Sequence, residues 1–542
     1  MTDIDPIDFV ARITAGYAAN GPTLDLGRGI INGTLVPDAA VQLPLSMMSR
    51  HGLIAGATGT GKTKTLQLLV EQLSDAGVPT FAADIKGDLT GLSQPGEASA
   101  KLTERVNDLK LQWLAAGKPV SFLSLGGIGT GVPVRAAVSS FGPTLLAKVL
   151  GANDTQRSAL SMVFHYADSV QLALLDLDDV RAVLQYLTSD AGKAEREVLG
   201  GLSKQTAGVL LRKIVELHDQ GADDFFGEPE LDIADLMRTT PEGKGVATLL
   251  ELSAVQDRPK LFSTFLMWLL GELFEHLPEV GDLDKPKLVF FFDEAHFLFN
   301  DAPKDFIDQV AQTVRLIRSK GVGVFFITQL PDDVPNEVLA QLGNRVQHAL
   351  RAFTPRDAKA LKAAVTTYPK TADYDLEETL TQLGIGEAVI TTLTERGTPT
   401  PVVWTRMRPP SSLMAAIAPD AVAAAVQSDP LLAKYATEVD RDSAREILTA
   451  KLAPPQPPPA TTSSAPAQST PPARAPEPRA PEPRAPEPRA PGPRPAPQPS
   501  RERPRGSGKG DDNPITDFLG SREGRATMNT VLRGVFGLLK KR

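Results

Sequence analysis

The chain has 542 residues and a formal charge of −8, with 42% apolar and 23% charged residues, which is the composition of an ordinary globular protein. It contains no cysteine, which excludes a disulfide framework, a thiolate nucleophile and a zinc–thiolate site. The amino terminus, MTDIDPIDF, is acidic and has no basic segment before an apolar stretch, so we expect no secretory signal, no integral membrane segment and a cytoplasmic protein.

Charge and proline divide the chain into two unlike parts. Residues 453–542 carry 15 Lys and Arg against 8 Asp and Glu, a net +7, which leaves −15 for residues 1–452. The same tail holds 21 of the 46 prolines, between Pro454 and Pro514. A body this acidic is not a general nucleic-acid binder, so any polyanion site on it must be local.

Residues 1–45 are expected to be a short N-terminal segment with no room for a full barrel domain, and residues 46–140 to be the first part of the core. The apolar run His51–Ala55 predicts a strand, and Thr63–Ser74 has the apolar spacing of a helix. Between them lies a fit to G-x-x-x-x-G-K-[ST], the Walker A pattern, in the strand–loop–helix context that distinguishes a phosphate-binding loop from a chance glycine turn. The predicted nucleotide-binding residues are Gly56, Ala57, Thr58, Gly59, Thr60, Gly61, Lys62, Thr63 and Lys64.

The chemistry of phosphate and Mg²⁺ binding explains each residue type in this loop. Glycines let the backbone approach the phosphates closely, so that backbone N–H groups and the helix N-terminus face the negative charge. Lys62 is predicted to bridge the β- and γ-phosphates of ATP, and the Thr63 hydroxyl to bind Mg²⁺.

The next apolar run, Val78–Ala82, leads to Asp84 and the segment Asp84–Asp88. This segment would lie at the carboxyl edge of a parallel sheet, where ligands bind. We interpret it either as a loop facing a subunit interface or DNA, or as a turn with surface charge. A third strand is predicted at Val120–Leu125. Residues 141–280 are mostly helical in pattern, as in Thr155–Asp168, and predict a mainly helical insertion.

The second part of the core is expected at residues 281–410, and it begins with the most apolar short run in the chain, Leu288–Phe292. This run is followed by Asp293 and Glu294, the pattern of a Walker B strand. Asp293 is predicted to hold Mg²⁺ and Glu294 to act as the general base that polarises the attacking water. The alternative is an acidic pair that caps a helix.

Val322–Ile327 predicts another strand, after which Gln329 is a candidate sensor of the γ-phosphate; the alternative is a plain strand-ending turn. Positive charge for the transition state has no clear source within the chain. Arg345 and Arg351, which follow this strand, are therefore candidate arginine fingers supplied by a neighbouring subunit, with Arg315 and Arg318 as weaker candidates.

Apolar runs that alternate with helical segments predict an α/β fold with a mostly parallel sheet covered on both faces. Residues 411–452 are expected to be a helical C-terminal extension. Residues 453–513 contain APEPR three times and predict a disordered linker, either a spacer or a docking site for a proline-binding module. Residues 514–542 predict a basic amphipathic helix with an unknown partner, which docks on protein or lies on an anionic surface.

Several of these motifs together resemble the bacterial HerA-like ATPases, the helicase HerA-like C-terminal domain family within the HerA/FtsK superfamily of P-loop motors. The resemblance runs from about Leu24 to about Pro410. It rests on RHGLIAGATGTGKTKTLQ, FAADIKGDLTGL, KLVFFFDEAHFLF, VRLIRSKGVGVFFITQ and QLGNRVQHALRAFTPRD. It implies a RecA-like P-loop core, a homo-hexameric ring and ATP-driven translocation of duplex DNA. It also supports the roles given to Lys62, Thr63, Asp293, Glu294 and Gln329.

Two function hypotheses follow from the sequence. The first is a Mg²⁺-dependent ATP hydrolase in a hexameric ring that translocates or remodels duplex DNA. The second is an ATPase that acts on a protein or membrane-associated complex without translocating DNA.

Overall fold

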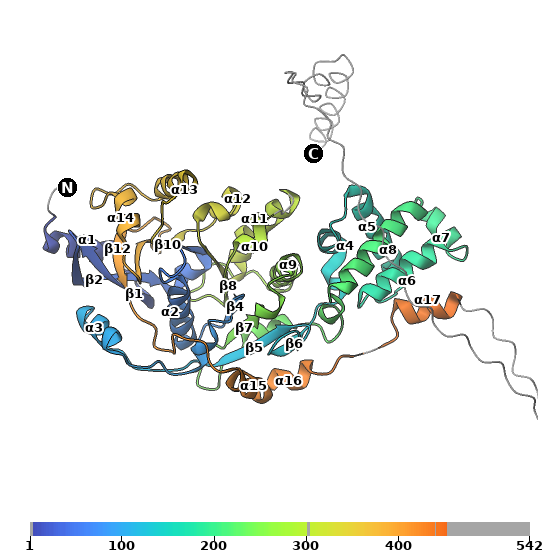
Figure 1. The fold of residues 1–542 in the computed structure, drawn as a ribbon, viewed down its shortest axis with the longest axis horizontal. Coiled ribbons are helices and arrows are strands. Elements are labelled where there is room, and N and C mark those ends of the chain that lie inside the picture. The colour runs from blue at the N-terminus through green and yellow to red at the C-terminus, as the bar shows by residue number, and fades with distance from the viewer. Residues whose placement is uncertain (1–3, 301–303, 440, 453–542) are drawn as a thin grey trace, which may run out of the picture. The chain divides into compact units, whose positions relative to one another are not determined.

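The computed structural model describes residues 4–300, 304–439 and 441–452 (Figure 1). The linker expected at residues 453–513 and the basic helix expected at residues 514–542 lie outside these residues. Within the described residues, no helix is both long and apolar enough to cross a bilayer.

A single sheet of twelve strands forms the centre of the fold. Every pairing from β10 to β6 is parallel, and every pairing from β2 to β10 is antiparallel. In order across the sheet, the strands are β2 (Thr34–Pro44), β1 (Thr23–Ile31), β12 (Val403–Met407), β11 (Glu387–Thr391), β10 (Asn344–His348), β3 (Gly52–Ala55), β9 (Val322–Thr328), β8 (Leu288–Phe292), β4 (Thr80–Asp84), β7 (Ala247–Glu251), β5 (Val120–Leu125) and β6 (Val132–Val134).

The central parallel strands β3, β9, β8 and β4 are mostly apolar, as strands buried on both faces must be, whereas the parallel strand β10, NRVQH, is largely polar. All residues of β3, β4, β8 and β9 are buried. Aromatic rings in β8 pack on those of neighbouring strands, such as Phe291 on Phe325 with 5.4 Å between ring centroids. The expected α/β P-loop core with a mostly parallel sheet is therefore confirmed.

In the described part of the chain, a helix follows most of the parallel strands, whereas β1 and β2, β5 and β6, and β11 and β12 are joined without an α-helix (Figure 1). Those outside the segment between β6 and β7 are α1 (Pro6–Gly16), α2 (Lys62–Asp75), α3 (Ala100–Asp108), α9 (Pro259–His276), α10 (His296–Phe299), α11 (Lys304–Ile317), α12 (Asn336–Leu339), α13 (Pro355–Thr366), α14 (Leu376–Gln382), α15 (Pro419–Ser428), α16 (Pro430–Tyr435) and α17 (Ala444–Leu452).

A helical group lies between β6 and β7. It consists of α4 (Val138–Val149), α5 (Asp154–Ser169), α6 (Leu177–Thr188), α7 (Lys193–Val198) and α8 (Lys204–Asp219). Helix α5 begins with a capping box formed by Asn153 and Gln156, which fixes its first turn. The range 141–280, expected to be mainly helical, also contains β7, an internal strand of the sheet.

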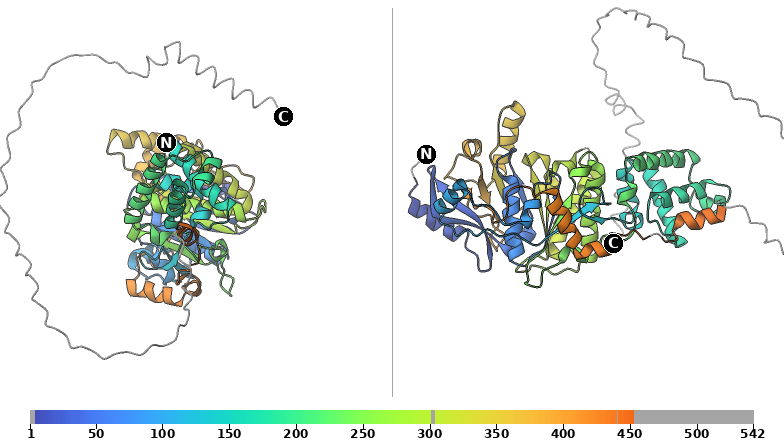
Figure 2. Two further views of the ribbon diagram at one scale, coloured as in Figure 1. Left: turned by 90° about the vertical axis from the view of Figure 1, so that its right-hand side faces the viewer. Right: turned by 60° about the horizontal axis from the view of Figure 1, so that its bottom comes forward.

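The last described helix, α17, is close in space to the helical group although it is remote in the sequence. It packs against α6, as both Figure 1 and Figure 2 show. The carboxylate of Asp179 in α6 joins the two, because its Oδ1 accepts from Ser443 Oγ at 2.5 Å and from Arg445 N at 2.8 Å. The extension expected at residues 411–452 thus runs from the sheet to the helical group.

Residues 1–45 become part of the main sheet. Strand β1 pairs with β12 in the register Gly27↔Met407 and with β2 on its other side, and α1 packs on β2 with Phe9 and Ile13 buried. These residues therefore extend the core sheet. They join it through β12, which lies nearly four hundred residues further along the chain.

Candidate active site

The phosphate-binding loop runs from Gly56 to Gly61, between the end of β3 and the start of α2. Gly56 has φ +153°, and a Cβ built on it would lie 2.5 Å from the Cβ of His348. Gly61 has φ +120°, and its Cβ would lie 3.3 Å from the Cα of Gly386. A side chain at either position would strain the backbone and crowd a neighbour, so both ends of the loop require glycine.

Neighbouring strand ends hold the loop in place. Its backbone hydrogen bonds run from Gly56 N to Thr328 O at 3.2 Å, from Ala57 N to Ala349 O at 2.9 Å, and from Gly386 N to Thr60 O at 2.9 Å. Of the other predicted loop residues, Thr58 and Gly59 are exposed, whereas Thr63 and Lys64 are half-buried in the first turn of α2. The loop therefore rests on the ends of β9 and β10 and is open at its tip.

Lys62 is buried beneath this loop. Its Nζ donates to Gly56 O at 2.6 Å and to Ala57 O at 3.2 Å, which are the carbonyls of the loop itself. Burial, aided by the nearby Lys86 ammonium, lowers the pKa of Lys62 despite the opposing charges of Glu294 and Asp293. The ammonium is thus held at the point where the loop would receive a phosphate.

Asp293 follows β8 directly and is only 4% exposed. Its Oδ1 accepts from Glu294 N at 2.9 Å, whereas its Oδ2 is buried and has no hydrogen-bond partner among the described residues. Burial, together with the adjacent Glu294 charge, raises the pKa of Asp293 to about 6. A buried carboxylate oxygen without a donor fits a Mg²⁺ ion or a water bound to it, and Thr63 supplies a hydroxyl in the first turn of α2.

Glu294 forms an ion pair that no motif in the sequence predicted. Its Oε1 accepts from Lys86 Nζ, and its Oε2 lies 3.3 Å from His296 Nδ1. Burial opposes ionisation of Glu294, but the Lys86 ammonium and His296 outweigh burial and hold its pKa below the ordinary value. The backbone at Glu294 has φ +46°, which is uncommon for a residue with a side chain. The carboxylate is therefore ionised and fixed in direction.

Asp84 explains how Lys86 reaches this position. It ends β4, the neighbour of β8, and its carboxylate accepts from Gly87 N at 2.8 Å and from Leu89 N at 2.9 Å. Burial raises the pKa of Asp84 to about 7. The segment Asp84–Asp88 thus turns back on itself and directs Lys86 to Glu294. The sequence pattern DIKGD singled out this segment, but nothing in the sequence indicated that Lys86 pairs with Glu294.

Gln329 lies at the same edge as the loop and Asp293. It follows β9, which lies between β3 and β8, and its side chain is exposed. The end of β9 is tied to the turn after it, because Thr328 Oγ1 donates to Asp333 Oδ2 at 2.6 Å. A residue at this position has the phosphate loop on one side and the carboxylates on the other.

The two candidate arginine fingers have different surroundings. Arg345 lies in β10, is half-buried and donates to Leu339 O at 3.4 Å, and burial lowers its pKa. Arg351 is exposed shortly after the end of β10. Only Arg351 is therefore placed to reach beyond its own chain.

His348 is a further residue at the loop that the sequence did not single out. It is fully buried, its Nδ1 lies 2.9 Å from Glu387 O, and its Nε2 lies 2.9 Å from Thr65 Oγ1. Because a carbonyl only accepts, Nδ1 carries the proton and Nε2 accepts from the threonine. Burial lowers the pKa of His348 to about 4, so the ring is a neutral bridge between β10, β11 and α2.

A cavity of about 570 Å³ adjoins the loop beside the first turn of α2. Three arginines and two lysines line it, and Arg105 of α3 also donates to Ile385 O at 2.8 Å. Its lining consists of Gly61, Lys64, Thr65, Ser99, Lys101, Leu102, Glu104, Arg105, Ile385, Gly386, Arg406, Met407, Arg408, Pro409, Pro410 and Met414. The cavity is open to the phosphate loop and strongly basic.

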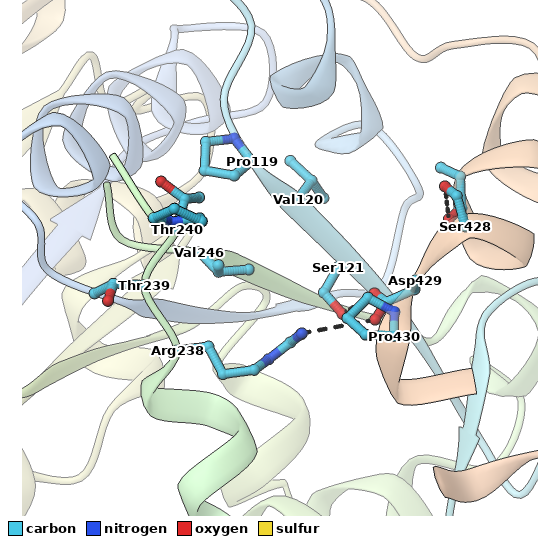
Figure 3. A pocket seen from close by; sticks show the side chains of 12 residues that line it. Pro119, Val120, Ser121, Arg238, Thr239, Thr240, Val246, Ser428, Asp429 and Pro430 are labelled. Atoms are coloured by element: carbon cyan, nitrogen blue, oxygen red, sulfur yellow. Dashed lines mark hydrogen bonds and ion pairs between the residues drawn. The ribbon is translucent and has the colours of Figure 1, made fainter. Parts of the chain in front are cut away.

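A second cavity, of about 510 Å³, lies at the amino edge of the sheet, where β5 and β7 begin (Figure 3). Ser121 Oγ donates to Asp429 Oδ2, and Arg238 Nη1 lies 3.7 Å from Asp429 Oδ1, whereas Arg238 Nη2 is buried without a hydrogen-bond partner among the described residues. This cavity is at the opposite edge from the phosphate loop, and its charged side chains connect α16 to the sheet.

A parallel sheet with a glycine loop and lysine after β3, and an Asp–Glu pair after β8, defines the class of P-loop ATPases. The chain belongs to the family described as Helicase HerA-like C-terminal, whose family model matches residues 32–541. This confirms the resemblance inferred from the motifs.

The chain is also similar to known proteins at low sequence identity. The chain is 20% identical over 371 residues to the DNA double-strand break repair helicase HerA of Saccharolobus solfataricus, covering 66% of this chain and 65% of that protein, less than two thirds of its length. Among solved structures, the plasmid coupling protein TrwB in complex with an ATP analogue is 16% identical over 73% of this chain and 99% of that chain, with a TM-score of 0.47. VirB4 of Thermoanaerobacter pseudethanolicus is 13% identical over 72% and 98%, with a TM-score of 0.44.

Proposed function

We propose that the protein is a Mg²⁺-dependent ATP hydrolase that assembles as a hexameric ring and translocates or remodels duplex DNA. The observation that carries the hydrolase is Glu294, a carboxylate fixed by Lys86 and next to the unsatisfied oxygen of Asp293. A protein that only binds nucleotide has no need of an oriented, ionised base at this edge.

Each residue of the site has a distinct role in this proposal. The loop backbone and Lys62 bind the phosphates. Asp293 and Thr63 would hold Mg²⁺, which would supply positive charge to the phosphate oxygens. Glu294 accepts the proton of the attacking water. The basic cavity beside Gly61 has the size and charge to receive the nucleoside and its phosphates.

Two further roles complete the site. We assign the sensor of the γ-phosphate to Gln329, because it follows the strand between β3 and β8. We assign the arginine supplied to a neighbouring subunit to Arg351 in preference to Arg345, because Arg351 is exposed whereas the Arg345 guanidinium donates within its own chain.

Duplex DNA as substrate is supported by membership of the HerA-like family and by the name of the Saccharolobus solfataricus relative, a DNA double-strand break repair helicase. The acidic charge of residues 1–452 requires that contact with DNA be confined to local basic surfaces.

ATP turnover with and without duplex DNA tests the proposal. We expect Glu294→Gln to lower kcat by about 10²- to 10⁴-fold while ATP still binds, and Lys62→Ala to abolish both binding and turnover. Duplex DNA is expected to raise the turnover of the wild type. Binding is followed with a fluorescent ATP analogue, so that loss of chemistry is separated from loss of affinity.

Each contrary result has a definite reading. A Lys62→Ala protein that hydrolyses ATP would overturn the active site itself. Turnover that depends on Glu294 and is unchanged by DNA would retain the ATPase and overturn the DNA motor. That second result would favour an ATPase acting on a protein or membrane-associated complex.

A further inference from the structure

Helix α13 carries a row of cations on its exposed side. Arg356, Lys359 and Lys362 are exposed, and none of them forms an ion pair or hydrogen bond with any described residue. Spacing of three residues gives about 4.5 Å of rise between successive cations and keeps all three on one side of the helix. This is an uncompensated basic row on a body whose net charge is −15.

Carboxylates also lie close to this row. Asp357 lies within α13 and forms a capping box with Thr354: Asp357 N donates to Thr354 Oγ1 at 3.2 Å, and Thr354 N donates to Asp357 Oδ2 at 3.0 Å. In the neighbouring helix α14, Glu378 accepts from Gln382 Nε2 at 2.9 Å. Neither carboxylate forms an ion pair with the three cations, which therefore remain available to a polyanion.

The residues that flank the row extend the same surface. Phe353 precedes α13 and is 85% exposed, and Lys370 follows the helix and is also exposed. An aromatic ring beside cations is a common feature of nucleic-acid surfaces, because the ring contacts sugars or bases where the cations contact phosphates. An exposed phenylalanine at this position has no packing role in its own chain.

From these observations we propose that the exposed face of α13, formed by Phe353, Arg356, Lys359 and Lys362, binds the phosphate backbone of duplex DNA. The proposal rests on the proposed function and names the surface through which that function engages DNA. Charge complementarity identifies the occupant: the three cations face outward and form no ion pair with any described residue, so the row attracts a polyanion such as the DNA backbone.

The same helix is in contact with the sensor end of the active site. It packs against the short helix η7 (Pro331–Asp333), which follows Gln329. Asp333 in η7 accepts from Thr328 Oγ1 at 2.6 Å and from Leu330 N at 2.9 Å. If α13 shifts when it binds DNA, the shift reaches Gln329 through one turn of backbone. This contact is therefore a physical route by which DNA would stimulate ATP hydrolysis.

The test uses the full chain with Arg356→Gln, Lys359→Gln and Lys362→Gln combined. Binding to a fluorescently labelled duplex of mixed sequence is measured by anisotropy over a series of salt concentrations. We expect weaker binding, and a slope of log K against log[salt] that is smaller by about 0.9 for each phosphate that the variant no longer neutralises. Turnover without DNA is expected to be unchanged, whereas stimulation by DNA is expected to be lost.

A matched control removes the same charges elsewhere. Lys204→Gln, Arg212→Gln and Lys451→Gln combined also remove two lysines and one arginine, all of them exposed; DNA binding and stimulation are expected to remain. A separate Phe353→Ala variant is expected to weaken binding without changing the salt slope.

The outcomes separate this proposal from the proposed function. If the wild type binds DNA and the triple variant keeps its affinity, salt slope and stimulation, the α13 surface is wrong and the DNA motor stands. If the wild type neither binds DNA nor responds to it, both fall together. If the control loses as much as the α13 variant, binding follows net charge and the α13 surface is again wrong.

Discussion

Lys86 and Glu294 are 208 residues apart in the chain, and their side chains form an ion pair at the carboxyl edge of the sheet. The pairing depends on β4 lying next to β8 and on Asp84, whose two backbone hydrogen bonds turn the following segment back. Lys86 is 44% exposed along its side chain, whereas Glu294 is almost fully buried. We therefore expect the lysine to act on the proposed hydrolysis through the position of Glu294.

Replacing Lys86 with methionine is expected to lower kcat by about 10- to 100-fold, since a misplaced base loses a catalytic geometry that binding alone does not supply. The KM for ATP should change much less, because Lys62 and the loop bind the phosphates. Lys86→Arg should recover part of the rate. Lys110→Met, which removes an exposed ion pair with Asp38, is the control. A Lys86→Met enzyme with unaltered kcat would show that the ion pair has no positioning role.

His51 is a buried neutral histidine whose effect on stability depends on pH. Val324 N donates to its Nδ1 at 3.0 Å, and burial, aided by Arg318 and Arg50, lowers its pKa to about 3. Because the folded pKa lies below the unfolded one, the unfolded state takes up the proton first. The stability that His51 contributes is therefore present above the unfolded pKa and is lost as pH falls below it.

We therefore expect His51→Asn to destabilise the protein at pH 7.5 and to do so less at pH 5.5. The deficit in unfolding free energy should shrink by about 1.4 kcal/mol between the two conditions, since the lower pH is one unit below the ordinary histidine pKa. His51 has φ +59° and ψ +170°, a conformation that strains any residue with a Cβ, so asparagine keeps the backbone restriction that histidine has there. Denaturant unfolding of both proteins at the two pH values measures the difference, and a constant deficit would contradict the prediction.

At the scale of elements, the sequence predicts one part of the sheet and not the other. The strands β3, β4, β5, β8 and β9 were predictable, because a strand buried on both faces is a continuous apolar run. The antiparallel strands were not: β1 contains two glycines and an arginine, and β12 is the short run VWTRM. The pairing of β1 with β12 joins strands that are nearly four hundred residues apart, so only the folded register identifies it.

The active site divides in the same way. Lys62, Thr63, Asp293 and Glu294 follow from local motifs, because each motif places its residue at a strand end or a helix start. Other contacts depend on which strands are neighbours, and no local pattern encodes that: these include Lys86 with Glu294, His348 with Thr65, and the cavity between α3 and the end of β12.

The contact between α6 and α17 is a second case of long-range pairing, and it depends on Asp179. Its buried carboxylate accepts from Leu175 N, Ser443 Oγ and Arg445 N. Asp179→Ala is expected to lower the unfolding free energy of the helical group by about 3 kcal/mol, because it leaves buried donors without an acceptor. Hydrogen exchange across residues 443–452 should accelerate.

The adjacent Asp178 provides the control. It forms partly exposed ion pairs with Arg181 at 3.3 Å and with Arg445 at 3.4 Å, and pairs of this kind contribute about 0–1 kcal/mol. Asp178→Ala should therefore change stability little and leave exchange in α17 near the wild-type rate. Equal effects of the two substitutions would show that charge near α17, and not the buried acceptor, holds it in place.

At the scale of the whole molecule, the buried core of the described residues reaches Leu448 in α17. Residues 453–542 carry the net +7 and the repeated APEPR segment. We expect a chain ending at Leu452 to keep its melting temperature, its assembly state and its turnover without DNA, because proline-rich segments bury little surface and do not add to a core. Differential scanning fluorimetry, mass photometry and the ATPase assay measure the three properties.

A lower melting temperature would show that the tail packs on the body, and a smaller assembly would show that it joins subunits. If all three are retained, the tail is not needed for folding, assembly or turnover. In a ring, several tails that bind one partner would do so with an affinity above that of one.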